Sequence, residues 1–163
     1  MNMNCTNAMP DDLDSLMYIE RCGFTAEEAA AETAMRERIQ VIPDTFLVAR
    51  NDTGRIIGFI VGPAVHERHI TDDLFTRTIP NDADAQYQTV LSLAVHPRYR
   101  TCGVAKYLLE KLKETATFRG RKAITLTCLE PLVGFYEKYG YINEGISQSA
   151  HAGEIWYNMV LEL

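Results

Sequence analysis

Two hydrophobic patterns alternate along the chain, and their order predicts strands and helices. Residues 87–96 form a mostly apolar run, which predicts a buried strand. Residues 103–117 instead repeat apolar side chains at helical spacing, with Val104, Leu108 and Leu112 on one face. This pair of segments predicts a strand that leads directly into a helix near the middle of the sequence.

The N-terminal part predicts two helices followed by a hairpin. Residues 2–8 suit a short first strand, and proline and acidic residues at 10–12 suit a helix start toward Gly23. Thr25 and Glu28 fit a capping box, which predicts a second helix from Thr25 to about Arg38. The β-rich runs 45–50 and 55–61 flank a turn signal and predict a β-hairpin.

Beyond the hairpin, residues 64–86 are polar and irregular, so we expect a mobile loop with one helical turn. The remaining segments predict a strand at 122–128, a short helix at 131–140 and strands at 141–147 and 154–163. The order predicts an α+β fold, with a mixed central sheet, flanking helices and a βαβ crossover at its centre. We expect a single domain over residues 1–163.

Composition and charge narrow the classes of function. The 163 residues carry a formal net charge of −6, which argues against a general nucleic-acid binder and is compatible with a cationic substrate. No apolar run is long enough to span a membrane, and the N-terminus lacks the pattern of a signal peptide. We therefore expect no membrane partner and a cytoplasmic location. The cysteines form no CxxC pair and are interpreted as reduced thiols: Cys5, Cys22, Cys102 and Cys128.

The junction between the apolar run and the helix carries the most informative short motif, Arg100-x-x-Gly103-x-Ala105. A helix N-terminus presents unpaired N–H groups and a partial positive charge, so it attracts anions. A glycine lets the backbone approach such an anion closely. The motif predicts a phosphate or pyrophosphate site, and an ordinary glycine-containing loop remains the alternative, because a short pattern is weak evidence by itself.

The segment "LAVHPRYRTCGVAKYLL" resembles the acetyl-CoA-binding segment of the GCN5-related N-acetyltransferase (GNAT) superfamily. That family's signature, Arg/Gln-x-x-Gly-x-Gly/Ala, is matched by Arg100, Gly103 and Ala105, and "LVGFYEKYGY" resembles the family's later helix-to-strand segment. The resemblance implies acetyl-CoA as cosubstrate. It implies a splayed strand whose backbone pairs with the pantetheine arm at Leu93, Ala94 and Val95.

The same resemblance implies that backbone amides cradle the pyrophosphate of acetyl-CoA. These are the amides of Thr101, Cys102, Gly103, Val104, Ala105 and Lys106. The side chains of Arg98, Arg100 and Lys106 are either close to the 3′-phosphate or ordinary solvated surface charges.

Within the superfamily, the chain most resembles the serotonin (arylalkylamine) N-acetyltransferases. The resemblance runs from about Tyr18 to Tyr141 and rests on "YIERCGF", "VHERHITDDLF", "LAVHPRYR" and "LTCLEPLVGFYEKYGY". There is one departure. Two histidines of that family, implicated in removing the amine proton, are matched here by Thr89 and Leu91, and neither can accept a proton. The catalytic base therefore does not carry over.

Tyr136 is the first catalytic candidate, because a phenol near the departing CoA thiolate can protonate it. It would then also contact acetyl-CoA. An alkylammonium has a pKa near ~10.4 and must lose a proton before it attacks. Glu20 is the leading candidate base. The alternatives are His66, His69 and a water held by Ser92 or Thr89. His66 and His69 are too few ligands for a metal site, and we expect no metal.

The acceptor site is predicted around Phe24, Thr127 and Cys128. Three further aromatic residues are candidates to shape that pocket, namely Phe59, Tyr87 and Tyr139. We interpret Cys128 as a thiol in the pocket wall and Cys102 as a loop residue, because the family transfers acetyl directly.

Three functions stay open from the sequence. The first is an N-acetyltransferase acting on a small primary amine, such as an arylalkylamine or a polyamine. The second is a protein N-terminal or lysine acetyltransferase on the same fold. The third is a non-catalytic acetyl-CoA sensor. We expect a monomer or homodimer.

Overall fold

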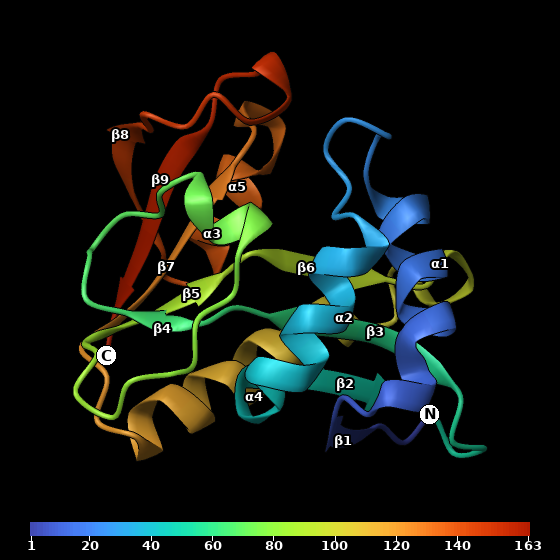
Figure 1. The fold of residues 1–163 in the computed structure, drawn as a ribbon. Coiled ribbons are helices and arrows are strands. Elements are labelled where there is room, and N and C mark those ends of the chain that lie inside the picture. Colours follow the sequence, from blue (N-terminus) through green and yellow to red (C-terminus); the bar gives the residue numbers. More distant parts are fainter.

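Strands from both halves of the chain build two sheets, seen side by side in Figure 1. The computed structural model describes residues 1–163. Its strands are β1 (Asn4–Asn7), β2 (Phe46–Arg50), β3 (Ile56–Val61), β4 (Ala64–Val65), β5 (Tyr87–Val90), β6 (Ser92–Val95), β7 (Ala123–Cys128), β8 (Ile142–Ile146) and β9 (Tyr157–Glu162). Its helices are α1 (Leu13–Gly23), α2 (Glu32–Val41), α3 (Asp73–Thr76), α4 (Val104–Phe118) and α5 (Glu130–Lys138). The predicted α+β class is confirmed.

The chain passes from one sheet to the other in the middle of the predicted central strand. The first sheet has the order β1-β2-β3-β6, and all its neighbours are antiparallel. The second has the order β4-β5-β7-β9-β8, in which β5 and β7 run parallel. The single run predicted at 87–96 is therefore two strands, interrupted at Leu91. The predicted βαβ crossover is confirmed as β5, α4 and β7.

This switch leaves one edge of β6 without a partner strand. β6 pairs with β3 on one side, in the register Phe59 to Ala94, and no strand pairs with its other side. β5 continues beside β7, in the register Thr89 to Thr125. The two sheets therefore diverge beyond Leu91, and the space between β6 and β7 is available for something other than a strand.

Helices cover both faces of the first sheet. Leu47 and Ala49 of β2 point into the cluster formed with α4, whereas Phe46 and Val48 point into the cluster formed with α1 and α2. α4 lies very close to β3, because a Cβ added to Gly58 would lie 2.8 Å from Val104 Cγ1. The glycine therefore seats the first turn of α4 directly against the sheet. None of the helices is both long enough and apolar enough to cross a membrane.

The start of the second helix differs from the prediction. The capping-box bonds between Thr25 and Glu28 do form, at 3.0 and 3.3 Å, but they close only a local turn. The amide of Ala29 still donates to the carbonyl of Thr25 at 2.8 Å, but that of Ala30 donates to the carboxylate of Glu20 at 2.8 Å, and Ala31 is extended. The chain is thereby held out of helical geometry until Glu32, so the predicted start at Thr25 is wrong.

The segment 64–86 contains the expected helical turn, α3, and a short strand, β4, that its polar sequence did not indicate. Arg68 of this segment binds Glu144 of β8 at 2.7 Å and Glu162 of β9 at 2.6 Å. His69 binds the same Glu144 at 2.7 Å. These contacts tie the segment to the second sheet, and its mobility stays a prediction.

The ion pairs of Glu144 should make stability depend on pH in the acid range. Hydrogen bonds from Arg68, and from His69, lower the pKa of Glu144 to about 2. The ion pairs of Glu144 therefore contribute fully to the free energy of unfolding above the unfolded-state pKa of about 4.3. This contribution is lost as the pH falls toward 2. We expect Glu144→Gln to destabilise the protein by about 1 kcal/mol at neutral pH, with a gap that closes in acid.

Urea unfolding at a series of pH values measures this gap. Glu137→Gln is the matched control, because Glu137 is exposed and belongs to no ion pair. The difference in free energy of unfolding between Glu137→Gln and the wild type should not shrink as the pH falls. A Glu144→Gln gap that stays constant between neutral pH and about pH 3 would contradict this account.

Candidate active site

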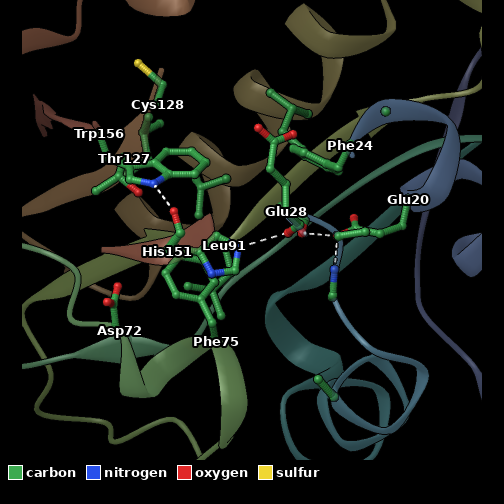
Figure 2. Close-up of a pocket in the computed structure, with 18 of the residues that line it drawn as sticks. Glu20, Phe24, Glu28, Asp72, Phe75, Leu91, Thr127, Cys128, His151 and Trp156 are labelled. Carbon is green, nitrogen blue, oxygen red and sulfur yellow. Dashed lines mark hydrogen bonds between the residues drawn. The ribbon is translucent and has the colours of Figure 1, made fainter. Parts of the chain in front are cut away.

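A cavity of about 580 Å³ lies where β6 and β7 separate. Residues of both strands line it, and 15 of its 25 lining residues are hydrophobic. Figure 2 shows Glu20 and Phe24 on one side of this cavity and Cys128, His151 and Trp156 on the other. The cavity is therefore an apolar chamber with a small number of polar groups, as is usual for a small-molecule site.

Glu20 is the buried carboxylate of this chamber. It comes from the last turns of α1 and is only 1% exposed. One oxygen, Oε2, accepts hydrogen bonds from the amide of Ala30 at 2.8 Å and from the hydroxyl of Ser92 at 3.3 Å. The other oxygen, Oε1, is buried with no partner. Burial raises the pKa of Glu20, which brings a carboxylate closer to the range in which it can take and release a proton.

Tyr136 lines the same cavity from α5. Its side chain is buried and packs edge-on against Phe135 and Tyr141, with ring centroids 5.1 and 5.6 Å away. Burial, and after it the nearby Cys128, raises the pKa of Tyr136. The phenol therefore keeps its proton at neutral pH and is available as a donor.

The thiol of Cys128 is an unsuitable nucleophile. It lies at the end of β7, is 3% exposed and lines the cavity. Burial raises its pKa to about 11, so it stays protonated at neutral pH. This agrees with its interpretation as part of the pocket wall. Phe24, Thr127 and Leu93 line the cavity with it.

The other candidate bases lie in different places. Ser92 lines the cavity and donates to Glu20. Thr89 does not line it, since its buried hydroxyl donates to the carbonyl of Pro63 at 2.7 Å. His66 pairs with Asp82 and His69 with Glu144, both partly exposed and outside the cavity. Of these four side chains, the structure thus brings only Ser92 to the chamber.

The predicted anion site is a strained loop at the start of α4. Gly103 caps the helix with φ at 82°, and Thr101 two residues earlier has φ at 64°, which is rare for a β-branched residue. The hydroxyl of Thr101 donates to the carbonyl of Arg100 at 2.5 Å. Left-handed residues before a helix turn successive N–H groups toward one point, which is the geometry of an anion-binding nest.

The side chains around this loop differ in their contacts and in their exposure to solvent. Arg100 donates to the carbonyl of Cys22 at 3.1 Å, which ties the loop to the end of α1. Cys102 and Lys106 are exposed, Ala105 is half-buried, and Val104 is buried in the core. Ala94 is buried on β6 and Val95 is half-buried. The loop therefore has backbone amides available for an anion, and the anion site itself stays a prediction.

Three aromatic residues predicted to shape the pocket lie elsewhere. Phe59 is fully buried against Phe46 in the core, with ring centroids 5.7 Å apart. Tyr87 packs beside the cluster of Val65, Ile70 and Leu74. Tyr139 packs on Phe135. The expectation for these three side chains is wrong, because each fills a gap beside its own strand or helix.

The residues that the sequence did not indicate come from α2, α3 and the C-terminal loop. His151 stacks on Phe75 with centroids 4.9 Å apart, and its Nε2 lies 3.0 Å from the carbonyl of Glu28. Trp156 donates to the carbonyl of His151 at 2.8 Å (Figure 2). Arg38 also lines the cavity, and the sequence pattern could have indicated it. It is a charged residue on the face of α2 that also carries the buried apolar residues Met35 and Ile39.

Charged groups gather around the cavity without forming a metal site. No cluster of three or more His, Cys, Asp or Glu side chains has the arrangement to hold a metal ion. The charged and polar residues that line the chamber include Glu20, Glu28, Ser92, Arg38 and His151, with Asp72 at one side. Asp72 accepts from the hydroxyl of Ser149 at 2.5 Å and from the amide of Ala150 at 3.0 Å.

Several solved structures share this fold over nearly the full length of the chain. Ard1 from Thermoplasma volcanium superposes with a TM-score of 0.78 at 18% identity, covering 100% of this chain and 99% of that one. The GNAT-like decarboxylase GphF, in complex with isobutyryl-CoA, superposes with a TM-score of 0.84 at 18% identity, covering 98% of each chain. At this identity the likeness establishes the fold.

Sequence comparison reaches two relatives at higher identity. The serotonin N-acetyltransferase of Mesocricetus auratus is 27% identical over 136 residues, which cover 81% of this chain and 64% of that protein. The chain therefore spans less than two thirds of that relative's length. An acetyltransferase of Pectobacterium atrosepticum is 27% identical over 135 residues, covering 80% of this chain and 82% of that protein.

The family itself is shown by a match that covers both the hairpin and the strand-to-helix junction. Residues 43–143, more than half of the chain, match the sequence model of the acetyltransferase (GNAT) domain. The predicted superfamily is thereby confirmed. The chain belongs to the GNAT acetyltransferase family.

Proposed function

We propose that the protein is an N-acetyltransferase that transfers acetyl directly from acetyl-CoA to a small primary amine. The observation that carries this proposal is the chamber between β6 and β7, which brings a buried carboxylate, Glu20, and a protonated phenol, Tyr136, into one apolar cavity. The unpaired edge of β6 opens on the same space. Family membership supports the cosubstrate.

Acetyl-CoA would lie along β6 and reach the start of α4. The backbone of Leu93, Ala94 and Val95 offers unpaired edge groups to the pantetheine amides, as an added strand would. The amides of residues 101–106 offer N–H groups to the pyrophosphate. The thioester would then enter the cavity next to the side chain of Leu93, which lines it.

The reaction forms a C–N bond and breaks a C–S bond. The ammonium of the acceptor first gives a proton to Glu20, either directly or through a water held by Ser92. The neutral amine then attacks the thioester carbonyl, and the nitrogen releases its second proton to solvent as the amide forms and the C–S bond breaks. The departing CoA thiolate takes a proton from Tyr136, which solvent later restores.

The walls of the chamber favour a small apolar amine over a protein substrate. The segment between α1 and α2 and the C-terminal loop meet beside the cavity, where His151 lies 3.0 Å from the Glu28 carbonyl. This contact joins the two segments beside the cavity, which suits a small acceptor better than an extended peptide. The side chains of Phe24, Phe75 and Trp156 offer an aromatic surface, which suits an arylalkyl group better than a polyamine (Figure 2).

The proposal extends to the compartment. All four cysteines are unpaired, and Cys22 and Cys102 are exposed. Exposed thiols persist in reducing surroundings, which supports a cytoplasmic enzyme. A monomer or homodimer remains our expectation for its assembly.

The dependence of kcat/KM on pH tests the role of Glu20. Burial raises the pKa of Glu20, so the wild-type profile should rise through that elevated pKa and then level off. In Glu20→Gln the base is absent, and the profile should climb by about tenfold per pH unit toward the amine's own pKa near ~10.4.

The matched control is a variant with alanine at both His66 and His69. These histidines lie outside the cavity, so its profile should coincide with that of the wild type. If Glu20→Gln also coincides with the wild type, Glu20 is not the base.

A further inference from the structure

Two opposite charges lie buried in the cavity wall without pairing with each other. Glu20 and Arg38 are each 1% exposed, and both line the chamber. Each acts electrostatically on the other, yet no contact within 4.0 Å joins them. Opposite charges in a low-dielectric interior attract strongly, so a purely structural pair would be expected to close.

Hydrogen bonds hold the two groups apart. The Oε2 of Glu20 is fixed by the amide of Ala30 and the hydroxyl of Ser92. One terminal nitrogen of Arg38 donates to the carbonyl of Phe75 at 3.3 Å. Each side chain is therefore anchored to a different part of the wall, with the chamber beside both.

Each group also keeps polar atoms that nothing in the chain satisfies. Glu20 retains Oε1, and Arg38 retains Nε and one terminal nitrogen, all buried and without a partner. Unsatisfied charged atoms are costly in a protein interior and rarely occur without a function. A carboxylate oxygen can only accept a hydrogen bond, and guanidinium nitrogens can only donate. The wall thus lacks one donor beside Glu20 and one acceptor beside Arg38.

We propose that the acceptor is an amino acid, whose ammonium is bound by Glu20 and whose carboxylate is bound by Arg38. This inference rests on the proposed function and names its substrate class. A zwitterion supplies the missing donor and the missing acceptor together. A simple alkylamine satisfies Glu20 and leaves Arg38 unpaired.

Such a ligand would meet both charged groups from inside the chamber, because Glu20 and Arg38 line it. The guanidinium is planar and presents paired N–H groups that fit a carboxylate in a bidentate manner. The remaining lining is largely apolar and includes Phe24, Phe75 and Trp156. The side chain of the amino acid is therefore apolar or aromatic.

Matched pairs of acceptors test the inference on the wild-type protein. Tryptophan is compared with tryptamine, phenylalanine with phenethylamine, and each amino acid with its methyl ester, with kcat/KM measured by release of free CoA. A charged hydrogen-bonded contact is worth about 10- to 100-fold in kcat/KM. We expect the amino acids to exceed their decarboxylated and esterified partners by this factor.

Substitution of Arg38 shows whether this residue is the cause. In Arg38→Met the preference for the carboxylate should disappear, and in Arg38→Lys part of it should return. The ratio of two acceptors on one protein sample does not depend on how much of the sample is folded. Arg121→Met is the control, because Arg121 is also a buried arginine but binds the carbonyls of residues 82, 83 and 85 outside the cavity. It should keep the wild-type ratio.

Thermal stabilisation of the CoA-bound protein by the same compounds separates this inference from the proposed function. If amines are acetylated as well as or better than the amino acids, the inference is overturned and the function stands. If nothing is acetylated but amino acids stabilise the wild type and not Arg38→Met, the assignment of Glu20 and Arg38 as an amino-acid binding pair stands, and the acetyl transfer falls. If there is neither turnover nor stabilisation by amino acids, both are overturned.

Discussion

Replacing Tyr136 with phenylalanine should lower kcat about 100-fold and leave the affinity for acetyl-CoA nearly unchanged. The phenyl ring keeps the edge-on contacts with Phe135 and Tyr141, so the packing of α5 is preserved. Only the proton donor for the departing thiolate is lost. Steady-state kinetics with a saturating amine and calorimetric titration of acetyl-CoA measure the two quantities.

Tyr141→Phe is the matched control for this substitution. Tyr141 is buried beside Tyr136, its pKa is also raised by burial, and its hydroxyl has no partner. It does not line the cavity. Its loss should leave kcat within about threefold of the wild type, whereas a Tyr136→Phe rate in that same range would make Tyr136 a packing residue.

Replacing Gly103 with valine should weaken acetyl-CoA binding by about 100-fold. Gly103 has φ at 82° and no atom lies within 4 Å of a Cβ built there, so the obstacle is backbone conformation rather than space. A β-branched residue disfavours this conformation, and its relaxation would turn the amides of the nest away from the pyrophosphate. Calorimetry on the folded variant measures the loss.

Gly120 provides a control at the opposite end of the same helix. It has φ at 73°, and a Cβ there would also meet nothing within 4 Å. Gly120→Val should cost a similar free energy of unfolding without changing acetyl-CoA affinity. Equal affinities for the Gly103 and Gly120 variants would show that the cosubstrate does not use the start of α4.

The sequence indicated the elements whose signals are local. The hairpin of β2 and β3 and the helices α4 and α5 follow from hydrophobic spacing and turn residues close in the chain. The sequence did not indicate the interruption at Leu91, because the residues on both sides of it are largely buried and form one apolar run from 87 to 96. The delayed start of α2 depends on a bond from Ala30 to Glu20, ten residues earlier, which no local pattern reveals.

The same distinction holds for the site. Glu20, Phe24, Thr127, Cys128 and Tyr136 all line the cavity, because motif resemblance placed them in segments that the fold brings together. His151 and Trp156 lie in an irregular loop whose path is set by tertiary contacts, such as the bond from Trp156 to the carbonyl of His151. Phe59 was predicted to shape the pocket only because it is aromatic. That prediction is wrong, because most aromatic residues fill cores.

Product stoichiometry is the most direct test of an acetyl transfer within the cavity between β6 and β7. Mass spectrometry of a reaction of the wild-type protein with acetyl-CoA and an aromatic acceptor carrying a primary amine should find one N-acetylated acceptor for each CoA released. The protein itself should remain unmodified at Cys128 throughout turnover. Release of CoA without acetylated acceptor, or an acetyl group on Cys128 that turns over with product, would contradict direct transfer.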